Sequence, residues 1–430
     1  MSPQILLMFI FFTLLLLGVP VAILILLTAI IGLFFREVPM TIIVQNLQAN
    51  LISQTYLAVP MYVFAGILMS ESGIARKIFD FANSVVGHVK GGLGHVNVLA
   101  SMIFAGISGS STADAAGLGR IEIQAMNEAG YDVGFSAAIT AVSSIIGPII
   151  PPSIHMMIYA TIAEVPAATL LIAGLGPGLL MGFALMVAIY IMTATGMVKC
   201  PTQFERLNLR RIFIKFKEGF WALIAPIIII GCIMFGIVTP TEAGVIAVFY
   251  TLLIGVFVYK TINLKGIFLC LEETACAMGV VSFMIAVAQI FTWYITIENV
   301  PTKLFNFVTS TTDNKSIILI MVAIVLLILG TIATASANIV LVTPILLPLL
   351  LNLGMDPIHI GVIIVFGLVI GIITPPVGVS LYVVADVAKL PFEKVVRSVM
   401  VFLIPLILCL FILMFFPIIS LFIPKLVGLM

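Results

Sequence analysis

The chain has 430 residues, of which 62% are hydrophobic and 9% are charged, and its formal net charge is +1. Soluble domains carry roughly a quarter charged residues, so this composition excludes a soluble globular domain and indicates a polytopic membrane protein. The sequence has no basic tract, so we expect no nucleic-acid partner. The expected partners are the lipid bilayer, other membrane chains and small solutes.

Nine apolar stretches are long enough to span a bilayer as helices, at about 20 residues for each crossing. The first has no charge between Gln4 and Phe35, which is too long for the apolar core of a signal peptide, so we expect it to remain as a membrane helix. Between Gly73 and Val86, apolar residues recur at helical spacing opposite a charged face, which predicts a helix in the membrane interface. The nine stretches are 4–34, 53–70, 134–163, 168–196, 220–236, 242–259, 270–296, 357–385 and 400–424.

Two further apolar stretches, 93–128 and 316–352, are each divided by a polar segment of small residues. Each half has about 15 residues, which is too short to cross a bilayer comfortably. Each stretch is therefore predicted to be a re-entrant helical hairpin that enters and leaves on one side. Irregular backbone at membrane depth is tolerated only where protein buries it or where it lines a wet cavity.

The chain is duplicated, because a paired-proline break occurs at matching places in its two halves. Residues 147–152 read Gly-Pro-Ile-Ile-Pro-Pro and residues 371–376 read Gly-Ile-Ile-Thr-Pro-Pro, with Pro151 and Pro375 separated by 224 positions. Each copy is therefore expected to contain one proline-broken helix, and such paired interruptions are the best sequence indication of a transporter's binding site. The same spacing matches Gly106 with Gly330, Thr112 with Ser336, Asp114 with Asn338, Gly130 with Gly354, and Asp132 with Asp356.

Lys and Arg collect on one side of the membrane when both hairpins are counted as non-crossing. Cytoplasmic loops hold the excess of these residues, so that side is the cytoplasm and the N-terminus is expected to be cytoplasmic. Hairpin 1 then enters from the cytoplasm and hairpin 2 from outside, which makes the two copies an inverted repeat. The residues behind this orientation are Arg76, Lys77, Lys90, Lys199, Arg206, Arg210, Arg211, Lys215, Lys217, Lys260, Lys265, Lys389, Lys394 and Arg397.

The tip of hairpin 1, residues 106–117, combines glycines, hydroxyls and one carboxylate. These are hard oxygen ligands that suit Na⁺, so we assign Ser110 and Asp114 to a cation site. At a helix N-terminus the same groups would favour a substrate carboxylate, to which we assign Ser108, Ser111 and Thr112. The alternative for the segment is close packing of small residues, and the alternative for Asp114 is a cap on the returning helix.

The tip of hairpin 2, residues 330–338, offers hydroxyls and one amide but no charge. We assign Thr331 and Thr334 to a cation and Ser336 and Asn338 to the substrate. Asp114 is thus the one ionised side chain of the two tips, and an acid at membrane depth is costly enough to indicate a function. The site is expected to be asymmetric although its scaffold is repeated.

In each paired-proline segment the prolines remove backbone donors and leave carbonyl oxygens without partners. These oxygens are candidate cation ligands, and a plain proline kink is the alternative. Ser153 and His155, just past the first break, are assigned to the substrate. Asp132 and Asp356 precede long apolar stretches and are predicted to be helix N-caps. The residues of the two breaks that we assign to Na⁺ are Gly147, Pro151, Gly371 and Thr374.

An ordered set of motifs covers essentially the whole chain. It reads Gly-Gly-Leu-Gly at 91–94, Ser-Gly-Ser-Ser-Thr-Ala-Asp at 108–114, Gly-Pro-Ile-Ile-Pro-Pro-Ser at 147–153, Thr-Pro-Thr-Glu-Ala-Gly at 239–244 and Thr-Pro-Pro-Val-Gly at 374–378. This set resembles the large membrane subunit of tripartite ATP-independent periplasmic (TRAP) transporters. The resemblance implies an all-α, ion-transporter-superfamily fold of elevator type, in which the hairpins and broken helices form a moving transport domain.

The resemblance also implies the partners. It implies Na⁺ as the coupling ion, an organic acid as the substrate, a small four-helix membrane subunit and a periplasmic substrate-binding protein, all at the bacterial inner membrane. We expect the small subunit to be a separate chain, because no further four-helix block precedes the first span. Many family members have an acidic residue where this chain has Thr334. The second cation site would then rely on hydroxyls and carbonyls, or the number of coupled ions would differ.

The same resemblance divides the chain into a transport domain and a scaffold. The transport domain is expected at residues 93–163, with hairpin 1 and the first broken helix, and at 316–385, with hairpin 2 and the second. The scaffold is expected at residues 1–92, 164–315 and 386–430.

The leading hypothesis is a secondary transporter rather than an enzyme. The sequence has no Gly-x-x-x-x-Gly-Lys-[Ser/Thr] loop with which to use ATP, so an ion gradient must drive uptake. One alternative is a passive channel. Another is an intramembrane serine protease, because residues 106–109 fit Gly-x-Ser-Gly with Ser108 as nucleophile and His155 as base. A protease has no need of a second, inverted copy.

Overall fold

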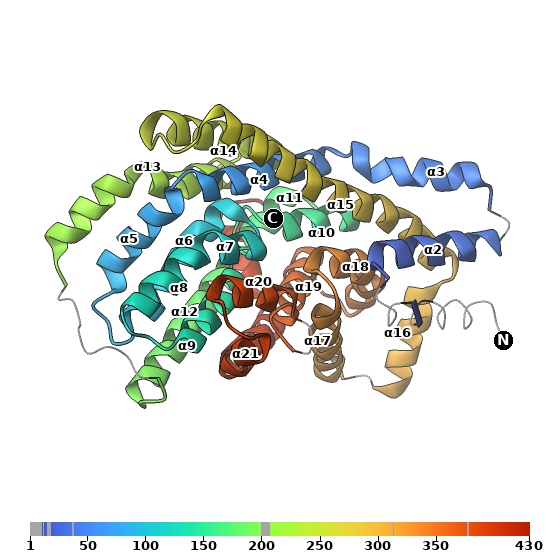
Figure 1. Cartoon of the computed structure of the whole chain (residues 1–430). Helices are drawn as coiled ribbons and strands as arrows, with labels where there is room; N and C mark the ends of the chain where they lie inside the picture. The colour runs from blue at the N-terminus through green and yellow to red at the C-terminus, as the bar shows by residue number, and fades with distance from the viewer. Residues whose placement is uncertain are drawn as a thin grey trace.

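The computed structural model describes residues 11, 13–14, 19–36, 38–198, 207–312, 314–375 and 378–430, and these are helical with no strand. Figure 1 shows the arrangement of the helices. Those of the first half are α2 (Val21–Phe34), α3 (Met40–Ala49), η1 (Asn50–Ile52), α4 (Gln54–Glu71), α5 (Ile74–Val86), α6 (Gly92–Ser108), α7 (Ser111–Ala116), α8 (Leu118–Glu128), α9 (Val133–Ser144), α10 (Ile154–Ala163), α11 (Ala167–Ala173) and α12 (Leu175–Ala194). Those of the second half are α13 (Leu209–Met234), α14 (Pro240–Leu253), η2 (Ile254–Val258), α15 (Leu264–Ile297), α16 (Val300–Thr311), α17 (Lys315–Ile332), α18 (Ala335–Asn352), α19 (Pro357–Gly371), α20 (Val379–Ala388), α21 (Phe392–Phe415) and α22 (Ile418–Leu426).

Seven helices of the described chain are long and apolar enough to cross a membrane, or eight if one bent pair counts as a span. Five of the seven correspond to predicted spans: Ala167–Ala194, α13, Pro240–Val258, α15 and α21. Within the predicted first span, 4–34, the structure describes residues 11, 13–14 and 19–34, which include α2. The bent pair joins α4 to α5 at 70°. Gly73 permits this turn with a positive φ of 74°, so the helix predicted between Gly73 and Val86 is confirmed.

Both predicted hairpin breaks are confirmed. In the first, α6 ends at Gly109, whose φ of 63° is left-handed, and the chain continues through the short α7 into α8. In the second, α17 ends at Ile332 and α18 begins at Ala335. Each half of the second hairpin has 18 residues, more than the expected length, so either could cross a membrane by length alone. That hairpin 2 is re-entrant stays a prediction.

Both proline breaks are also confirmed. The helical backbone stops after Ser144 and resumes at Ile154 in the first copy, and it stops after Gly371 and resumes at Val379 in the second. Pro376 lies outside the described residues. The second halves of the two broken helices, α10 and α20, end in the same way. Each is followed by a residue with left-handed backbone conformation, Glu164 (φ 54°) and Lys389 (φ 53°).

The predicted N-caps hold as well, because the Asp132 carboxylate accepts from the Phe135 amide at 3.0 Å and the Asp356 carboxylate accepts from the Ile358 amide at 2.8 Å. Local chemistry therefore sets where α9 and α19 begin.

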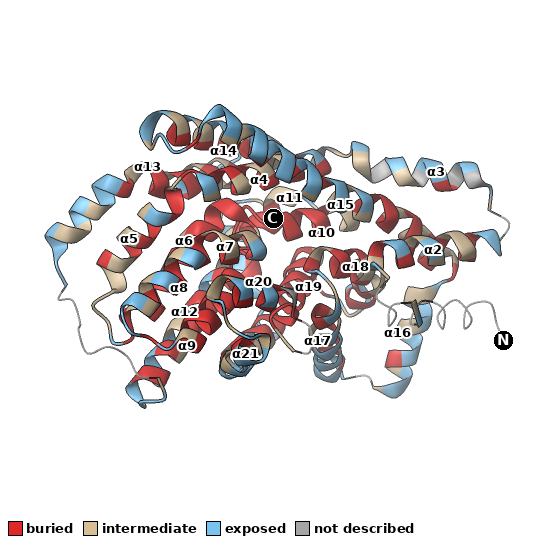
Figure 2. Cartoon of the chain, viewed as in Figure 1, coloured by how far each residue is buried: buried red, intermediate tan, exposed pale blue. Residues whose placement is uncertain are grey.

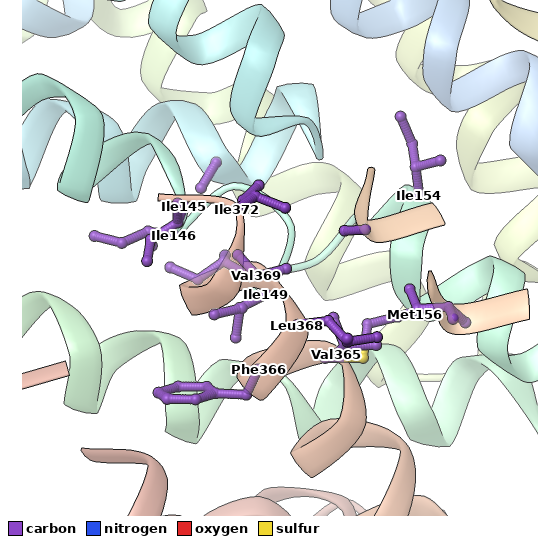
Figure 3. Packing of buried hydrophobic residues seen from close by; sticks show 14 of the residues in the cluster. Ile145, Ile146, Ile149, Ile154, Met156, Val365, Phe366, Leu368, Val369 and Ile372 are labelled. Atoms are coloured by element: carbon purple, nitrogen blue, oxygen red, sulfur yellow. The ribbon is translucent and has the colours of Figure 1, made fainter. Parts of the chain in front are cut away.

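The two broken helices form the centre of the molecule. Every residue of α19 from Ile358 to Gly371 is buried, and Figure 2 shows α9, α10 and α19 as the most buried helices, with exposed faces on α14, α15 and α17. A helix that is apolar all round belongs in a core rather than at a surface. Figure 3 shows Ile146 and Ile149 of the first break beside Val369 and Ile372 of the second. The breaks therefore pack on each other.

Long helices enclose this centre. α15 packs on α2, α3, α4 and α18, α14 packs on α4, and α13 packs on α5 and α6. An ion pair joins the ends of α2 and α15, where Arg36 donates to both oxygens of Glu298 at 2.7 and 3.0 Å. The hydrogen bonds to Glu298, together with its charge, raise the pKa of the Arg36 guanidinium above its usual value. Glu298 is 5% exposed and Arg36 is 50% exposed, so the pair lies at the edge of the core with its carboxylate buried.

Candidate functional site

One cavity of about 780 Å³ lies where the two hairpin tips meet. Hairpin 1 contributes the hydroxyls of Ser108, Ser110 and Thr112, and hairpin 2 contributes those of Thr334 and Ser336. The remaining walls come from α4, α8, α15 and the second halves of the broken helices, which add His155 and Ser380. The fold thus brings together six of the residues assigned to the site from sequence: Ser108, Ser110, Thr112, His155, Thr334 and Ser336.

The Asp114 carboxyl group lies between the tip of hairpin 1 and the first broken helix. It is 2% exposed, and its Oδ1 accepts a short hydrogen bond from the Ser108 hydroxyl. Its Oδ2 has no hydrogen-bond partner among the described residues. A Cβ added to Gly147 would lie 2.4 Å from Oδ2, so only glycine leaves room for the carboxylate there. The two residues assigned to one cation site from sequence are therefore in contact.

The helix-cap alternative for Asp114 is wrong. Ser110 is the N-cap of α7 and accepts from the Ala113 amide at 3.4 Å, so Asp114 lies inside that helix. The returning helix α8 begins at Leu118, and its N-cap residue, Gly117, provides no side-chain cap. The Asp114 carboxylate is thus available to a ligand rather than committed to a helix end.

The glycines of hairpin 1 let its backbone contact the first proline break. A Cβ on Gly109 would lie 2.3 Å from the carbonyl oxygen of Pro152, and one on Gly106 would lie 3.7 Å from that of Pro151. Ser153 caps α10 by accepting from the Met156 amide at 3.1 Å, and its hydroxyl donates to the Pro148 carbonyl. The hydroxyl of Ser153 therefore bonds to backbone groups. The carbonyl of Pro151 lies against the backbone of hairpin 1 at Gly106.

The hairpin 1 tip also contacts the second broken helix. The hydroxyl oxygens of Ser111 and Ser380 are 3.5 Å apart, and both residues are buried. The hydroxyls of Ser110 and Thr112 are 3.1 Å apart and face the cavity. The two repeat copies, more than 200 residues apart in the sequence, thus both contribute hydroxyl groups to the same side of the cavity.

At the second tip, several candidate groups bond to backbone. The Asn338 amide donates to the carbonyls of Leu329 and Ala333 at 2.8 and 3.1 Å and so holds the end of α17. The hydroxyl of Thr331 donates to Ile328, and that of Thr374 donates to Ile370. The α17–α19 contact is backbone against backbone, since a Cβ on Gly330 would lie 2.6 Å from the Cα of Gly371.

The serine–histidine pair of a protease is not formed. The Ser108 hydroxyl donates to Asp114, and Ser108 is 1% exposed. Nδ1 of His155 has no partner among the residues that the structure describes. Ser108 therefore has no histidine base, and its hydroxyl orients the Asp114 carboxylate instead.

Three charged residues of the cavity were missed from sequence: Arg120 on α8, Glu71 at the end of α4 and Glu273 on α15. Arg120 lies six positions after Asp114, outside the segment taken as the tip. The two glutamates come from helices that only the tertiary fold brings near the tips.

Comparison with known proteins gives a consistent result. Residues 8–419 match the family model described as "Tripartite ATP-independent periplasmic transporter, DctM component". The chain is 38% identical to the sialic acid TRAP transporter large permease protein SiaM of Vibrio cholerae, over 89% of each chain. It is 37% identical to the C4-dicarboxylate TRAP transporter large permease protein DctM of Pseudomonas aeruginosa, over 87% of each. A crystal structure of the Alcanivorax borkumensis YdaH transporter shares the fold, with a TM-score of 0.62 over 87% of each chain at 14% identity.

Proposed function

The chain belongs to the DctM family of tripartite ATP-independent periplasmic transporters, and we propose that it is the large permease of a Na⁺-coupled importer of an organic acid. Two relatives named for sialic acid and for C4-dicarboxylates support a carboxylate substrate. The observation that carries the proposal is the cavity between the tips, which combines five tip hydroxyls with the guanidinium of Arg120. Hydroxyls and a guanidinium are donors that suit a carboxylate.

The proposed coupling ion binds beside Asp114. Its buried carboxylate has one oxygen without a partner, and the irregular backbone of the first break runs beside it at Gly147. A carboxylate and nearby carbonyl oxygens form a donor set that suits a small hard cation, and a cation would offset the cost of burying the charge. Ser110 and Pro151 complete the proposed first site. In the second copy the proposed ligands are Thr331, Thr334, Gly371 and Thr374.

We propose that the substrate is bound by side chains of both tips and of the first broken helix. Ser108, Thr112, His155 and Ser336 face the same cavity, which supports a shared site. Ser111, Ser153 and Asn338 stay proposed ligands, although in this conformation their polar groups are engaged with other protein groups.

The proposed mechanism moves residues 93–163 and 316–385 as one transport domain past a scaffold. The cavity walls support this division, because α4 and α15 face tips that come from both hairpins. Translation of the tips along these walls would carry the bound acid and Na⁺ from one side to the other. An elevator of this kind needs two stable positions of one rigid body.

The proposed assembly includes a small four-helix membrane subunit and a periplasmic substrate-binding protein that delivers the acid. The permease is proposed to lie in the bacterial inner membrane with a cytoplasmic N-terminus. The test is reconstitution of the three proteins in liposomes supplied with labelled sialic acid or a C4-dicarboxylate. Uptake that needs all three proteins supports the assignment, and ionic current without solute uptake would favour a channel.

A further inference from the structure

A second buried acid lies in hairpin 1 outside the cavity, within a cluster of five polar side chains. Glu122 of α8 is 1% exposed and faces α6 and α9. The other four members are also 2% exposed or less: Asn97 and Ser101 on α6, and Thr140 and Ser143 on α9. The structure thus surrounds one carboxyl group of the hairpin with hydroxyls and an amide at a helix–helix contact.

These side chains form one directional chain of hydrogen bonds. Ser101 donates to the Ser143 hydroxyl at 3.0 Å, and Ser143 donates to Asn97 Oδ1 at 2.6 Å. The Asn97 amide donates to the Thr140 hydroxyl at 2.7 Å, and Thr140 donates to Glu122 Oε2 at 3.5 Å. The chain ends at Glu122, whose Oε1 has no partner within the part of the molecule that the structure describes.

An ionised Glu122 would be very costly in this position. The hydrogen bond that it accepts from Thr140 is long, although the Ser101 hydroxyl also acts on the carboxyl group, and an unpaired buried carboxylate costs several kcal/mol even after relaxation. No basic side chain pairs with it among the described residues. Asp114 of α7 acts on Glu122 electrostatically and opposes a second negative charge, although no hydrogen bond joins the two.

No ion pair joins Glu122 to the elements packed on α8 within the described part of the chain. They are α5, α6, α7, α9 and α20, and α9 has no titratable side chain of its own. Arg120 lies on α8 itself but lines the cavity, and its charge acts on Asp386 of α20. The titratable groups on these packed elements are Arg76, Lys77 and Asp80 on α5, His95 on α6, Asp114 on α7, and Tyr382 and Asp386 on α20.

A metal ion fits this cluster less well than a proton does. The Asn97 and Ser143 oxygens are already joined by bonds of 2.6 to 3.0 Å within the chain, so a Na⁺ shell would have to break those bonds. A proton on Glu122 breaks none of the three short bonds. The neutral acid can donate to Thr140 in place of the long bond that it accepts.

We propose that Glu122 is a proton-binding site, distinct from the proposed Na⁺ sites. The side chain is a neutral carboxylic acid while α8 is seated on α6 and α9. When the chain unfolds and water reaches this group, the acid dissociates into a carboxylate and a proton that passes to the solvent. In the folded chain α8 packs closely on α9, since a Cβ on Gly119 of α8 would lie 2.7 Å from Thr140. Because the folded state keeps the proton, raising the pH favours unfolding.

The test is infrared spectroscopy of the purified full-length chain at neutral pH, which reports the carbonyl stretch of neutral carboxylic acids. We expect such a band, and we expect it to shift when the chain carries ¹³C-glutamate and to disappear in Glu122→Gln. Glu128→Gln on the same helix is the matched control, because Glu128 is exposed and bonds only to Gln124 in the structure. Its band should match that of the wild type.

Three outcomes would overturn the proposal. The first is a spectrum without the band, and the second is a band that shifts only with ¹³C-aspartate, which would place the proton on Asp114. The third is a band lost when NaCl replaces choline chloride, which would make Glu122 a Na⁺ ligand. The isotope measurement needs no variant, so poor folding of Glu122→Gln leaves the test intact. The thermal midpoint should also fall with rising pH in the wild type and fall less in Glu122→Gln.

Discussion

Oδ2 of Asp114 lies 2.4 Å from the position that a Cβ on Gly147 would occupy. This contact joins the tip of hairpin 1 to the first proline break, two segments that the sequence separates by a complete helix–turn–helix. The same oxygen, Oδ2, has no hydrogen-bond partner among the described residues. The contact is the geometric basis of the proposed first cation site.

Asp114→Asn should abolish stabilisation of the chain by Na⁺. A ligand that binds only the folded state stabilises it by about 2.7 kcal/mol at 100 times its Kd. The thermal midpoint of the wild type should therefore rise when NaCl replaces choline chloride, whereas the midpoint of the variant should not. Asp132→Asn is the control, because asparagine caps a helix as well as aspartate does. An equal rise in Asp114→Asn would remove this residue from the cation site.

Gly147→Ala should remove the Na⁺ response by a different route. The added methyl group would collide with Asp114, and overpacking of this kind costs about 1–3 kcal/mol. Gly279→Ala in α15 is the control, because a Cβ there meets nothing within 4 Å and alanine favours a helix. We expect a lower midpoint and no Na⁺ shift for Gly147→Ala, but an unchanged or higher midpoint for Gly279→Ala. A normal Na⁺ shift in Gly147→Ala would contradict the geometry.

Arg120→Gln should weaken uptake of a carboxylate by about tenfold or more, because a charge-assisted hydrogen bond contributes about 1.5–3 kcal/mol. Arg120→Lys should retain part of the uptake, since it keeps the charge but loses the planar fork. The control is Arg397→Gln, at an exposed arginine on α21 that does not line the cavity. Concentration-dependent uptake in proteoliposomes is the measurement. Unchanged uptake in Arg120→Gln would leave substrate recognition to the hydroxyls.

Arg36→Gln should lower the thermal midpoint, because it leaves the nearly buried Glu298 without its bidentate partner. The raised pKa of Arg36 means that this stabilisation is complete below the ordinary pKa of arginine and is lost only above it. The effect should therefore be constant around neutral pH. In a double-mutant cycle, Glu298→Gln should cost less in the Arg36→Gln background than in the wild type. Additive losses would show that the pair is not coupled.

The breaks in the helices could be predicted because their causes are local. Prolines at 151 and 375 remove backbone donors, and Asp132 and Asp356 cap the helices that precede the breaks. The residues of each tip were predicted for the same reason. The composition of these segments predicts an interruption of the membrane helix.

The residues that depend on packing could not be predicted. Glu71 and Glu273 reach the cavity only because α4 and α15 enclose the tips. The amide of Asn338 looks like a free ligand in the sequence, but it holds the carbonyls at the end of α17. The helical halves of hairpin 2 were predicted too short, since the polar segment is largely helical and only Ala333 and Thr334 interrupt it.

The central claim is that uptake of an organic acid is driven by Na⁺ through Asp114. The most direct measurement is uptake into liposomes that contain this chain, its small subunit and the binding protein loaded with a labelled acid. An inward NaCl gradient is compared with a choline chloride gradient of equal strength. The account predicts uptake with Na⁺ only, and little in Asp114→Asn. Equal uptake in the two gradients, or full Na⁺-driven uptake in Asp114→Asn, would contradict it.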